Sequence, residues 1–351
     1  MEEVLEFLKQ AVNDGASDLF LLAGSPITEK VDGHIRPLND KKLFVEDLLR
    51  ITDHIYAYSG RDAANYDTCG DDDFSFAVPG LARFRVNAYR QRGSRAMVIR
   101  IVPFEIPDWQ TLHIPEEVMN LSEVSSGMIL VTGTAGSGKS ATQACILDRI
   151  NSTREAHIIT LEDPIEYLHR HKKSIISQRE VAVDTRDYLS ALRACLRQAP
   201  DVILLGEMRD LETISTAMTA AETGHLVIAT LHTKSAVNTI DRILDTFPST
   251  QQNQVRLQLG SVLHTVVSQQ LLPDTNGGLI PAFEIMHMDN AIRNMIRDNK
   301  NHQINNAISS GAAAGMISMD QYILGLYQSG SISRDTALGY CDNPELLAKK
   351  L

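Results

Sequence analysis

The strongest chemical signal in the sequence is a glycine-rich run that ends in a lysine and a serine. It fits the pattern G-x-x-x-x-G-K-[ST] in full and comprises Gly133, Thr134, Ala135, Gly136, Ser137, Gly138, Lys139 and Ser140. The glycines let the backbone curl, so that consecutive N–H groups point inward and can hold phosphate oxygens. Lys139 would reach the β- and γ-phosphates of a nucleotide, and the Ser140 hydroxyl would ligate Mg²⁺. The alternative, a glycine-rich turn without a ligand, is disfavoured by the strand-like residues before the run and the helix-like residues after it.

Two acidic segments follow this phosphate loop, and each begins where an apolar run ends. Glu162 lies in TLEDPIE after the apolar HII, and Glu207 ends the run DVILLGE. Carboxylates at the carboxyl ends of parallel strands face the edge where ligands bind in α/β sheets. We therefore predict that Glu162 supports the metal and its water shell. Glu207 would bind the metal through water and act as a general base. For either acid alone, a helix N-cap or a surface charge is the alternative.

A third segment, GHLVIATLHT at residues 224–233, places a histidine at each end of an apolar strand. His232 lies at the carboxyl end, on the expected ligand side, where it could sense the γ-phosphate through a hydrogen bond or cap the next helix. His225 lies at the opposite end, which favours a packing or interface role. The two imidazoles are therefore too far apart to share a metal ion. No Asn-Lys-x-Asp sequence occurs, so guanine specificity has no support.

The elements that must position these residues have the pattern of an α/β domain. From about residue 120, the apolar runs GMILVTG, HIITLEDP, DVILLGEM and HLVIATLH alternate with longer helical stretches. Such runs are typical of buried parallel strands. The first hundred residues have the pattern of a small mixed α+β domain, and prolines cluster after it. We predict an amino-terminal domain at 1–102, a linker at 103–119, and an ATPase domain with a helical carboxyl-terminal part at 120–351.

The composition limits the compartment and the class of partner. The formal net charge of -11 argues against a nucleic-acid motor, because such motors present basic surfaces to phosphates. The amino terminus lacks a basic region followed by an apolar stretch, and no apolar run approaches the ~20 residues that span a bilayer. The four cysteines form no Cys-x-x-Cys pair, which argues against a zinc site and suits a reducing compartment. We expect a cytoplasmic protein that binds no nucleic acid.

Several long motifs in a fixed order resemble those of the secretion and pilus motor ATPases of the type II/IV superfamily. They are GASDLFLLAG, ARFRVNAY, TLEDPIEY, APDVILLGEMRDLETI, AAETGHLVIATLHT, DRILDTFP and AIRNMIRD. The sequence is most similar to the PilT type IV pilus retraction ATPases. This resemblance implies a RecA-like P-loop ATPase domain with a parallel sheet, preceded by a small PAS-like α+β domain. It also implies a homohexameric ring with nucleotide bound between the two domains.

The resemblance assigns roles to individual residues as well. By motif match, Glu162 is the acid of the Asp box, Glu207 is the Walker B acid, and His225 and His232 belong to the His box. Three arginines of the small domain match family arginines: Arg83, Arg85 and Arg100. Of these, Arg85 and Arg100 are expected to approach the γ-phosphate of ATP.

The implied activity is Mg²⁺-dependent ATP hydrolysis that powers pilus retraction and twitching motility. The implied partners are the inner-membrane platform protein and the rest of the pilus machinery, reached from the cytoplasmic face of the cell membrane. AIRNMIRD is implied to be a retraction-specific element. Its Ile292, Met295 and Ile296 share an inward helical stripe, and its two arginines lie on another face.

Some residues depart from the family pattern, and rival functions stay open. Ala135 and Ala141 stand where the family has threonines, and Thr134 stands for its proline; we still include Ala141 among the nucleotide-binding residues. The rivals are an assembly or secretion ATPase of the same superfamily, a nucleic-acid translocase, and a catalytically weak accessory subunit of a ring. AIRNMIRD argues against the first, the net charge against the second, and the intact Lys139 and Glu207 against the third.

Overall fold

The chain folds into two compact units, and a computed structural model describes residues 2–31, 33–102 and 105–351. The first unit comprises Met1–Glu105 with Glu166–Leu168, and the second comprises Ile106–Ile165 with His169–Leu351. The division along the chain falls within the proline-rich stretch 103–119, whose role as a linker stays a prediction. Residues 103–104 of that stretch lie outside the described residues. No helix among those described is both long and apolar enough to cross a membrane.

The first unit is built on a six-stranded sheet in which all pairings are antiparallel, in the order β3-β2-β1-β6-β5-β4. Its strands are β1 (Asp18–Leu21), β2 (Pro26–Val31), β3 (His34–Lys42), β4 (Asp71–Val78), β5 (Ala82–Gln91) and β6 (Ser94–Val102), and its helices are α1 (Glu2–Asn13), α2 (Val45–Ser59) and α3 (Ala64–Cys69). Burial alternates along β5, where Phe84 and Val86 point into the core. Arg83 and Arg85, which alternate with them, therefore lie on the other face of the sheet.

The second unit is built on a seven-stranded sheet in the order β13-β12-β7-β11-β10-β8-β9. Its strands are β7 (Gly127–Thr132), β8 (His157–Glu162), β9 (Ile175–Glu180), β10 (Val202–Leu205), β11 (Leu226–Leu231), β12 (Leu263–Pro273) and β13 (Leu279–His287). Every pairing is parallel except that of β12 with β13. The predicted α/β fold with a parallel sheet, preceded by a small α+β domain, is confirmed.

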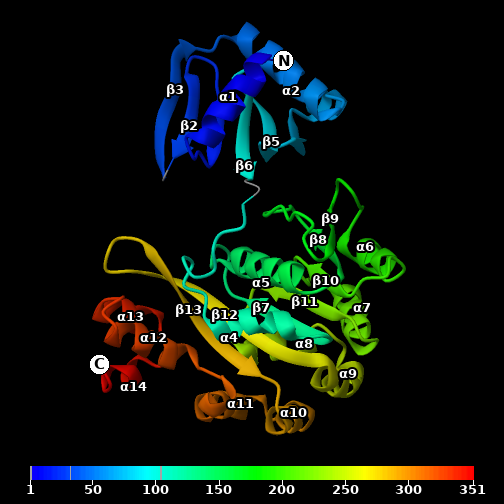
Figure 1. The fold of residues 1–351 in the computed structure, drawn as a ribbon, viewed down its shortest axis with the longest axis vertical. Coiled ribbons are helices and arrows are strands. Elements are labelled where there is room, and N and C mark those ends of the chain that lie inside the picture. Colours follow the sequence, from blue (N-terminus) through cyan, green and yellow to red (C-terminus); the bar gives the residue numbers. More distant parts are fainter. Residues whose placement is uncertain (1, 32, 103–104) are drawn as a thin grey trace. The chain divides into compact units, whose positions relative to one another are not determined.

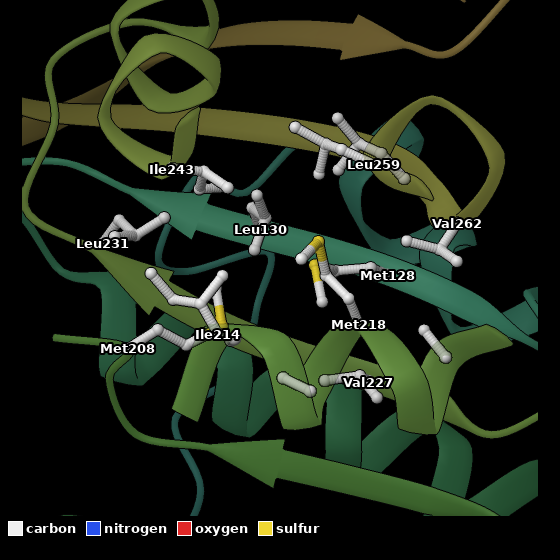
Figure 2. Close-up of a cluster of buried hydrophobic side chains, with 14 of the residues drawn as sticks. Met128, Leu130, Met208, Ile214, Met218, Val227, Leu231, Ile243, Leu259 and Val262 are labelled. Atoms are coloured by element: carbon white, nitrogen blue, oxygen red, sulfur yellow. The ribbon is translucent and has the colours of Figure 1, made fainter. Parts of the chain in front are cut away.

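Helices cover both faces of this parallel sheet (Figure 1). The α-helices of this unit are α4 (Glu116–Met119), α5 (Lys139–Thr153), α6 (Tyr188–Cys195), α7 (Leu211–Glu222), α8 (Ala236–Asp245), α9 (Ser249–Val262), α10 (Asn290–Arg297), α11 (Ile304–Ser310), α12 (Met319–Gln328), α13 (Arg334–Tyr340) and α14 (Pro344–Ala348). Met128 and Leu130 of β7 point into a cluster shared with α7 and α9, as Figure 2 shows. Ile129 and Val131 point to the opposite face, toward α5. Burial on both faces explains the near-continuous apolar strands of the sequence.

The hairpin formed by β12 and β13 was not predicted from the sequence. It extends the parallel sheet beyond β7, and β12 pairs in parallel with β7 so that Ser268 lies beside Thr132. On the other side of the hairpin, β13 pairs antiparallel with β12, with Ser268 opposite Glu284 and Gln269 opposite Phe283. The hairpin therefore runs directly alongside the strand that leads into the phosphate loop.

Candidate active site

The predicted phosphate loop joins the end of β7 to the start of α5. Thr132 is the last residue of β7 and Lys139 is the first residue of α5. Gly133, Gly136 and Gly138 have positive φ angles of 146°, 76° and 88°, which residues with a side chain rarely adopt. The turn thus leads into a helix whose first backbone N–H groups lack intrahelical partners, and such a helix start favours an anion.

The side chain of Lys139 folds back over this turn. It is 8% exposed, and its Nζ donates hydrogen bonds to the carbonyl oxygens of Gly133 at 2.9 Å and Thr134 at 2.8 Å. Burial lowers the pKa of Lys139, and the charge of Glu207 opposes that shift. The two carbonyl acceptors carry no net charge, so a phosphate would give this ammonium group its strongest partner.

The hydroxyl of Ser137 supplies an independent test of whether a phosphate fits. Its Oγ is buried, and within the described part of the chain it has no hydrogen-bond partner. An unsatisfied buried hydroxyl costs about 1–3 kcal/mol, so an acceptor at this position would be stabilising. The other predicted loop residues around it are exposed or half-buried: Thr134, Ala135, Gly136, Ser140 and Ala141. The donors of the loop therefore fit the phosphates of a nucleotide.

Strand β12 supports the loop from behind, through residues that the sequence analysis missed. Gln269 is buried, and its Oε1 accepts a hydrogen bond from the Thr142 hydroxyl of α5 at 2.8 Å. The Thr132 hydroxyl donates to the Ser268 Oγ at 3.0 Å. Two consecutive residues of β12 thus hold both ends of the phosphate loop. The signal in the sequence was a polar Ser-Gln-Gln inside an otherwise apolar run, VVSQQLL.

The two predicted acids end neighbouring strands at the same edge of the sheet. Leu161 of β8 pairs with Leu205 of β10; Glu162 follows Leu161 directly, and Glu207 follows Leu205 after one glycine. Oε1 of Glu162 accepts hydrogen bonds from the Thr160 hydroxyl at 2.6 Å and from Gln178 Nε2 at 3.3 Å. These contacts fix the carboxylate that was predicted to support the metal.

Glu207 is the more enclosed of the two acids, at 8% exposure. Its Oε1 lies 2.5 Å from Nη2 of Arg209, and its Oε2 lies 3.5 Å from Nε2 of His232. His232 follows β11, whose last residue Leu231 pairs with Thr132 next to the phosphate loop. The structure thus brings Lys139, Glu207 and His232 to one edge of the sheet.

His225 lies at the opposite edge, before β11 begins. Its Nδ1 lies 2.9 Å from the carbonyl oxygen of Ala220 and 3.2 Å from the hydroxyl of Thr223. Both partners belong to the end of α7 or directly follow it. These contacts suit the packing role considered for His225, and its place among the nucleotide-binding residues stays a prediction.

Tyr188 is a further residue of this edge that the sequence did not indicate. A Cβ atom added to Gly206 would lie 2.8 Å from the Tyr188 hydroxyl and 3.1 Å from the Leu161 carbonyl. Glycine before Glu207 thus allows the tyrosine to reach the ends of β8 and β10. Burial raises the pKa of Tyr188, and the carboxylates of Glu207, Asp163 and Glu162 add to that shift. Tyr188 therefore stays a neutral phenol beside the acids.

Comparison with known proteins decides the family. A family model described as "Type II/IV secretion system protein" matches residues 2–312. The "Type IV pilus retractation ATPase PilT" of Pseudomonas aeruginosa is 44% identical, over 98% of this chain and 99% of the relative. A "Twitching motility protein" of Neisseria gonorrhoeae is 42% identical, over 91% of this chain and 85% of the relative. The chain belongs to the PilT family of type IV pilus retraction ATPases.

A solved structure of this PilT family supports the same assignment in three dimensions. The pilus retraction motor PilT with bound ADP superposes with a TM-score of 0.89 at 46% sequence identity, and the match covers 98% of each chain. Nearly the whole fold of this PilT-family chain is therefore shared with a nucleotide-binding motor.

The arginines that the PilT family resemblance singled out lie on the first unit. Arg85 of β5 pairs with Arg100 of β6, and Arg100 pairs with Asp18 of β1, so the three side chains share one face of the sheet. Nε of Arg100 lies 3.0 Å from Oδ1 of the buried Asp18. Arg83 donates to the Ser75 hydroxyl at 2.5 Å. The contribution of these arginines to the nucleotide site stays a prediction.

The Mg²⁺ expected in a PilT family site would be held by few protein ligands. Among the residues that the structure describes, no group of three or more His, Cys, Asp or Glu side chains could hold a metal by itself. Mg²⁺ bound with a nucleotide completes its octahedral shell with phosphate oxygens and water. Ser140, Glu162 and Glu207 supply one hydroxyl and two carboxylates at the edge that carries the phosphate loop. Their donor set fits such an ion.

Proposed function

We propose that this chain binds ATP with Mg²⁺ at the phosphate loop and that its hydrolysis drives retraction of type IV pili. The observation that carries the proposal is the convergence of Lys139, Glu207 and His232 at one sheet edge. It occurs in a chain that is 44% identical, over nearly its full length, to a pilus retraction ATPase. The loop donors recognise phosphate, and the carboxylate beside them suits hydrolysis.

The residues would divide the chemistry between charge stabilisation and proton transfer. Lys139 would turn from its two carbonyl acceptors toward the β- and γ-phosphates. Glu207 would accept the proton of the attacking water, and His232 beside it would orient the carboxylate or sense the γ-phosphate. Ser140, Glu162 and Glu207 would hold Mg²⁺, which when bound would supply positive charge where the phosphate oxygens gain negative charge. Arg85 and Arg100 would stabilise the charge developing on the γ-phosphate.

A ring of identical chains would turn this chemistry into force. We propose a homohexamer in which nucleotide binds between the two domains and hydrolysis changes how tightly they close. The ring would work in the cytoplasm, at the inner face of the cell membrane. Its partner there would be the platform protein of the pilus machinery. The names of two relatives, a type IV pilus retractation ATPase and a twitching motility protein, support a place in the pilus machinery.

The proposal is tested by Mg²⁺-dependent ATP hydrolysis of the purified chain beside Glu207→Gln. Loss of the general base should lower kcat by about 10²–10⁴-fold while ATP still binds. Glu212→Gln is a matched control, because this exposed glutamate of α7 forms a surface ion pair with Arg193, at 3.1 Å. Its kcat should equal that of the parent. If the parent hydrolyses no more ATP than the variant at every protein concentration, the motor function is refuted and a catalytically weak accessory subunit of a ring becomes the favoured function.

A further inference from the structure

Glu284 is a buried carboxylate that the mechanism above does not use. It lies on β13 and is 3% exposed. Its neighbours on the same strand face are Ala282, which packs in a cluster with α12 and α13, and Met286, which packs in the large cluster with α7 and α9. A charged group between two apolar clusters is costly unless hydrogen bonds stabilise it. The hydrogen bonds of Glu284 therefore indicate its structural role.

The carboxylate of Glu284 holds the start of a helix. Its Oε1 accepts a hydrogen bond from the backbone N–H of Ala236 at 2.7 Å, and the backbone N–H of Met319 lowers the pKa of the same carboxyl group. Ala236 is the first residue of α8, and Met319 is the first residue of α12. The first N–H groups of a helix lack intrahelical partners, and a negative charge is favourable beside them. Glu284 thus ties the start of α8 to β13.

This contact matters because a loop of only four residues separates the end of β11 from the start of α8. The loop between them, 232–235, starts with His232, and its last residue Ser235 caps α8 by accepting from the Asn238 N–H at 3.3 Å. β11 fixes one end of this short loop beside the phosphate loop. Glu284 fixes the other end. With both ends held, the backbone that carries His232 has little freedom to move, and its imidazole lies 3.5 Å from Glu207.

We propose that Glu284 is a positioning residue for ATP hydrolysis, which acts by holding the His232 loop between β11 and β13. This inference rests on the proposed function, because it assigns Glu284 a role in the reaction of Glu207 and His232. It also gives a role to a carboxylate whose neighbours on the same strand face are apolar. Glu284 does not touch the nucleotide site itself, so its effect should pass through His232.

The charged groups around Glu284 provide a matched control. Asp320 of α12 and Asp342 both act on its carboxyl group, and Lys234 acts on Asp342. Asp320 itself accepts hydrogen bonds from the backbone N–H groups of Asp342 at 2.7 Å and Asn343 at 3.1 Å. It therefore stabilises the connection between α13 and α14 rather than the start of α8. Asp320→Asn should loosen these helices without moving His232.

The test compares steady-state ATP hydrolysis of the full chain with that of Glu284→Gln and Asp320→Asn at about pH 8. For Glu284→Gln we expect kcat to fall about tenfold while KM for ATP and the affinity for ADP change less than about twofold. Asp320→Asn should lower the melting temperature but keep the parental kcat. Equal losses of kcat in both variants, or no loss in Glu284→Gln, would overturn the inference. An inert parent would instead refute the proposed function, and the role of Glu284 with it.

A second measurement identifies the route through His232. In a chain that carries His232→Ala, adding Glu284→Gln should lower kcat no further, because residues that act through one another are not additive. The same tenfold loss in that background would overturn the inference. If Glu284→Gln does not fold, Glu284→Asp replaces it in both experiments. That variant keeps the charge but is too short to reach the start of α8, so the same pattern is expected.

Discussion

Gly133 is the glycine of the phosphate loop that lies closest to strand β12, which supports the loop from behind. A Cβ atom there would lie 2.3 Å from the carbonyl oxygen of Gln269 and 2.5 Å from Oγ of Ser137. Glycine is therefore required at this position by the approach of β12 as well as by its φ of 146°. The phosphate-loop pattern predicts a glycine here because the backbone must curl around a phosphate. The structure adds a second reason, which is the close approach of β12.

Gly133→Ala should disable the loop through this clash. We expect nucleotide affinity to fall more than tenfold and the protein to lose about 1–3 kcal/mol of stability, as overpacked sites do. Binding of a fluorescent ADP analogue and thermal unfolding would measure both. Gly330→Ala is the control, because Gly330 also has a positive φ, of 77°, but a Cβ atom there meets nothing within 4 Å. Parental nucleotide affinity in Gly133→Ala would contradict the expected clash.

The single residues expected to touch phosphate or water are marked by patterns in the sequence, and the residues that support them are not. Lys139 and Glu207 stand in short patterns whose spacing is set by the ligand, so one sequence suffices to find them. Gln269 and Glu284 act across strand pairings, and their partners are more than a hundred or nearly fifty residues away along the chain. The polar Ser-Gln-Gln run singles out Gln269, but nothing local identifies the partner of either residue, since these contacts depend on the register of β12 and β13.

Among the elements, the β12–β13 hairpin links the catalytic edge to the carboxyl-terminal helices. Its Ser268 and Gln269 hold the phosphate loop, and its Glu284 holds the start of α8. The apolar runs of the sequence predict the four central strands, but β12 and β13 combine polar and apolar residues and were not predicted. The AIRNMIRD segment forms α10, and Ile292 and Ile296 are buried on its inner face as their spacing predicts.

The hairpin also makes the stability of the second unit depend on pH. Burial, above all, raises the pKa of Glu284 from 4.5 to about 7. Between these values the unfolded chain has released the proton that the folded chain retains, so the free energy of unfolding falls as pH rises, and it levels off above about pH 7. From about pH 5 to pH 7 the melting temperature of the parent should fall several degrees more than that of Glu284→Gln. Equal slopes, followed by differential scanning fluorimetry, would contradict this assignment.

At the scale of the whole molecule, the two units carry complementary parts of the expected chemistry. The second unit supplies phosphate-binding donors and the acids, and the first supplies a pair of arginines on an exposed sheet face. Asp18 is buried and holds the guanidinium of Arg100 at 3.0 Å. The carboxylate limits the rotamers of this long side chain, which is what an arginine that must meet a phosphate requires.

Arg100→Ala should therefore separate turnover from binding. Loss of an arginine that stabilises the γ-phosphate in the transition state should lower kcat at least about a hundredfold, at the weaker end of what such arginines contribute, while ADP affinity changes only a few-fold. The control is Arg50→Ala on the same unit. Arg50 forms surface ion pairs with Glu3 of α1 and Asp47 of α2, and such exposed pairs contribute about 0–1 kcal/mol. Steady-state hydrolysis and ADP titration would measure both variants. Parental turnover in Arg100→Ala would mean that the first unit does not complete the site through Arg100, and Asp18 would then serve only the stability of its own sheet.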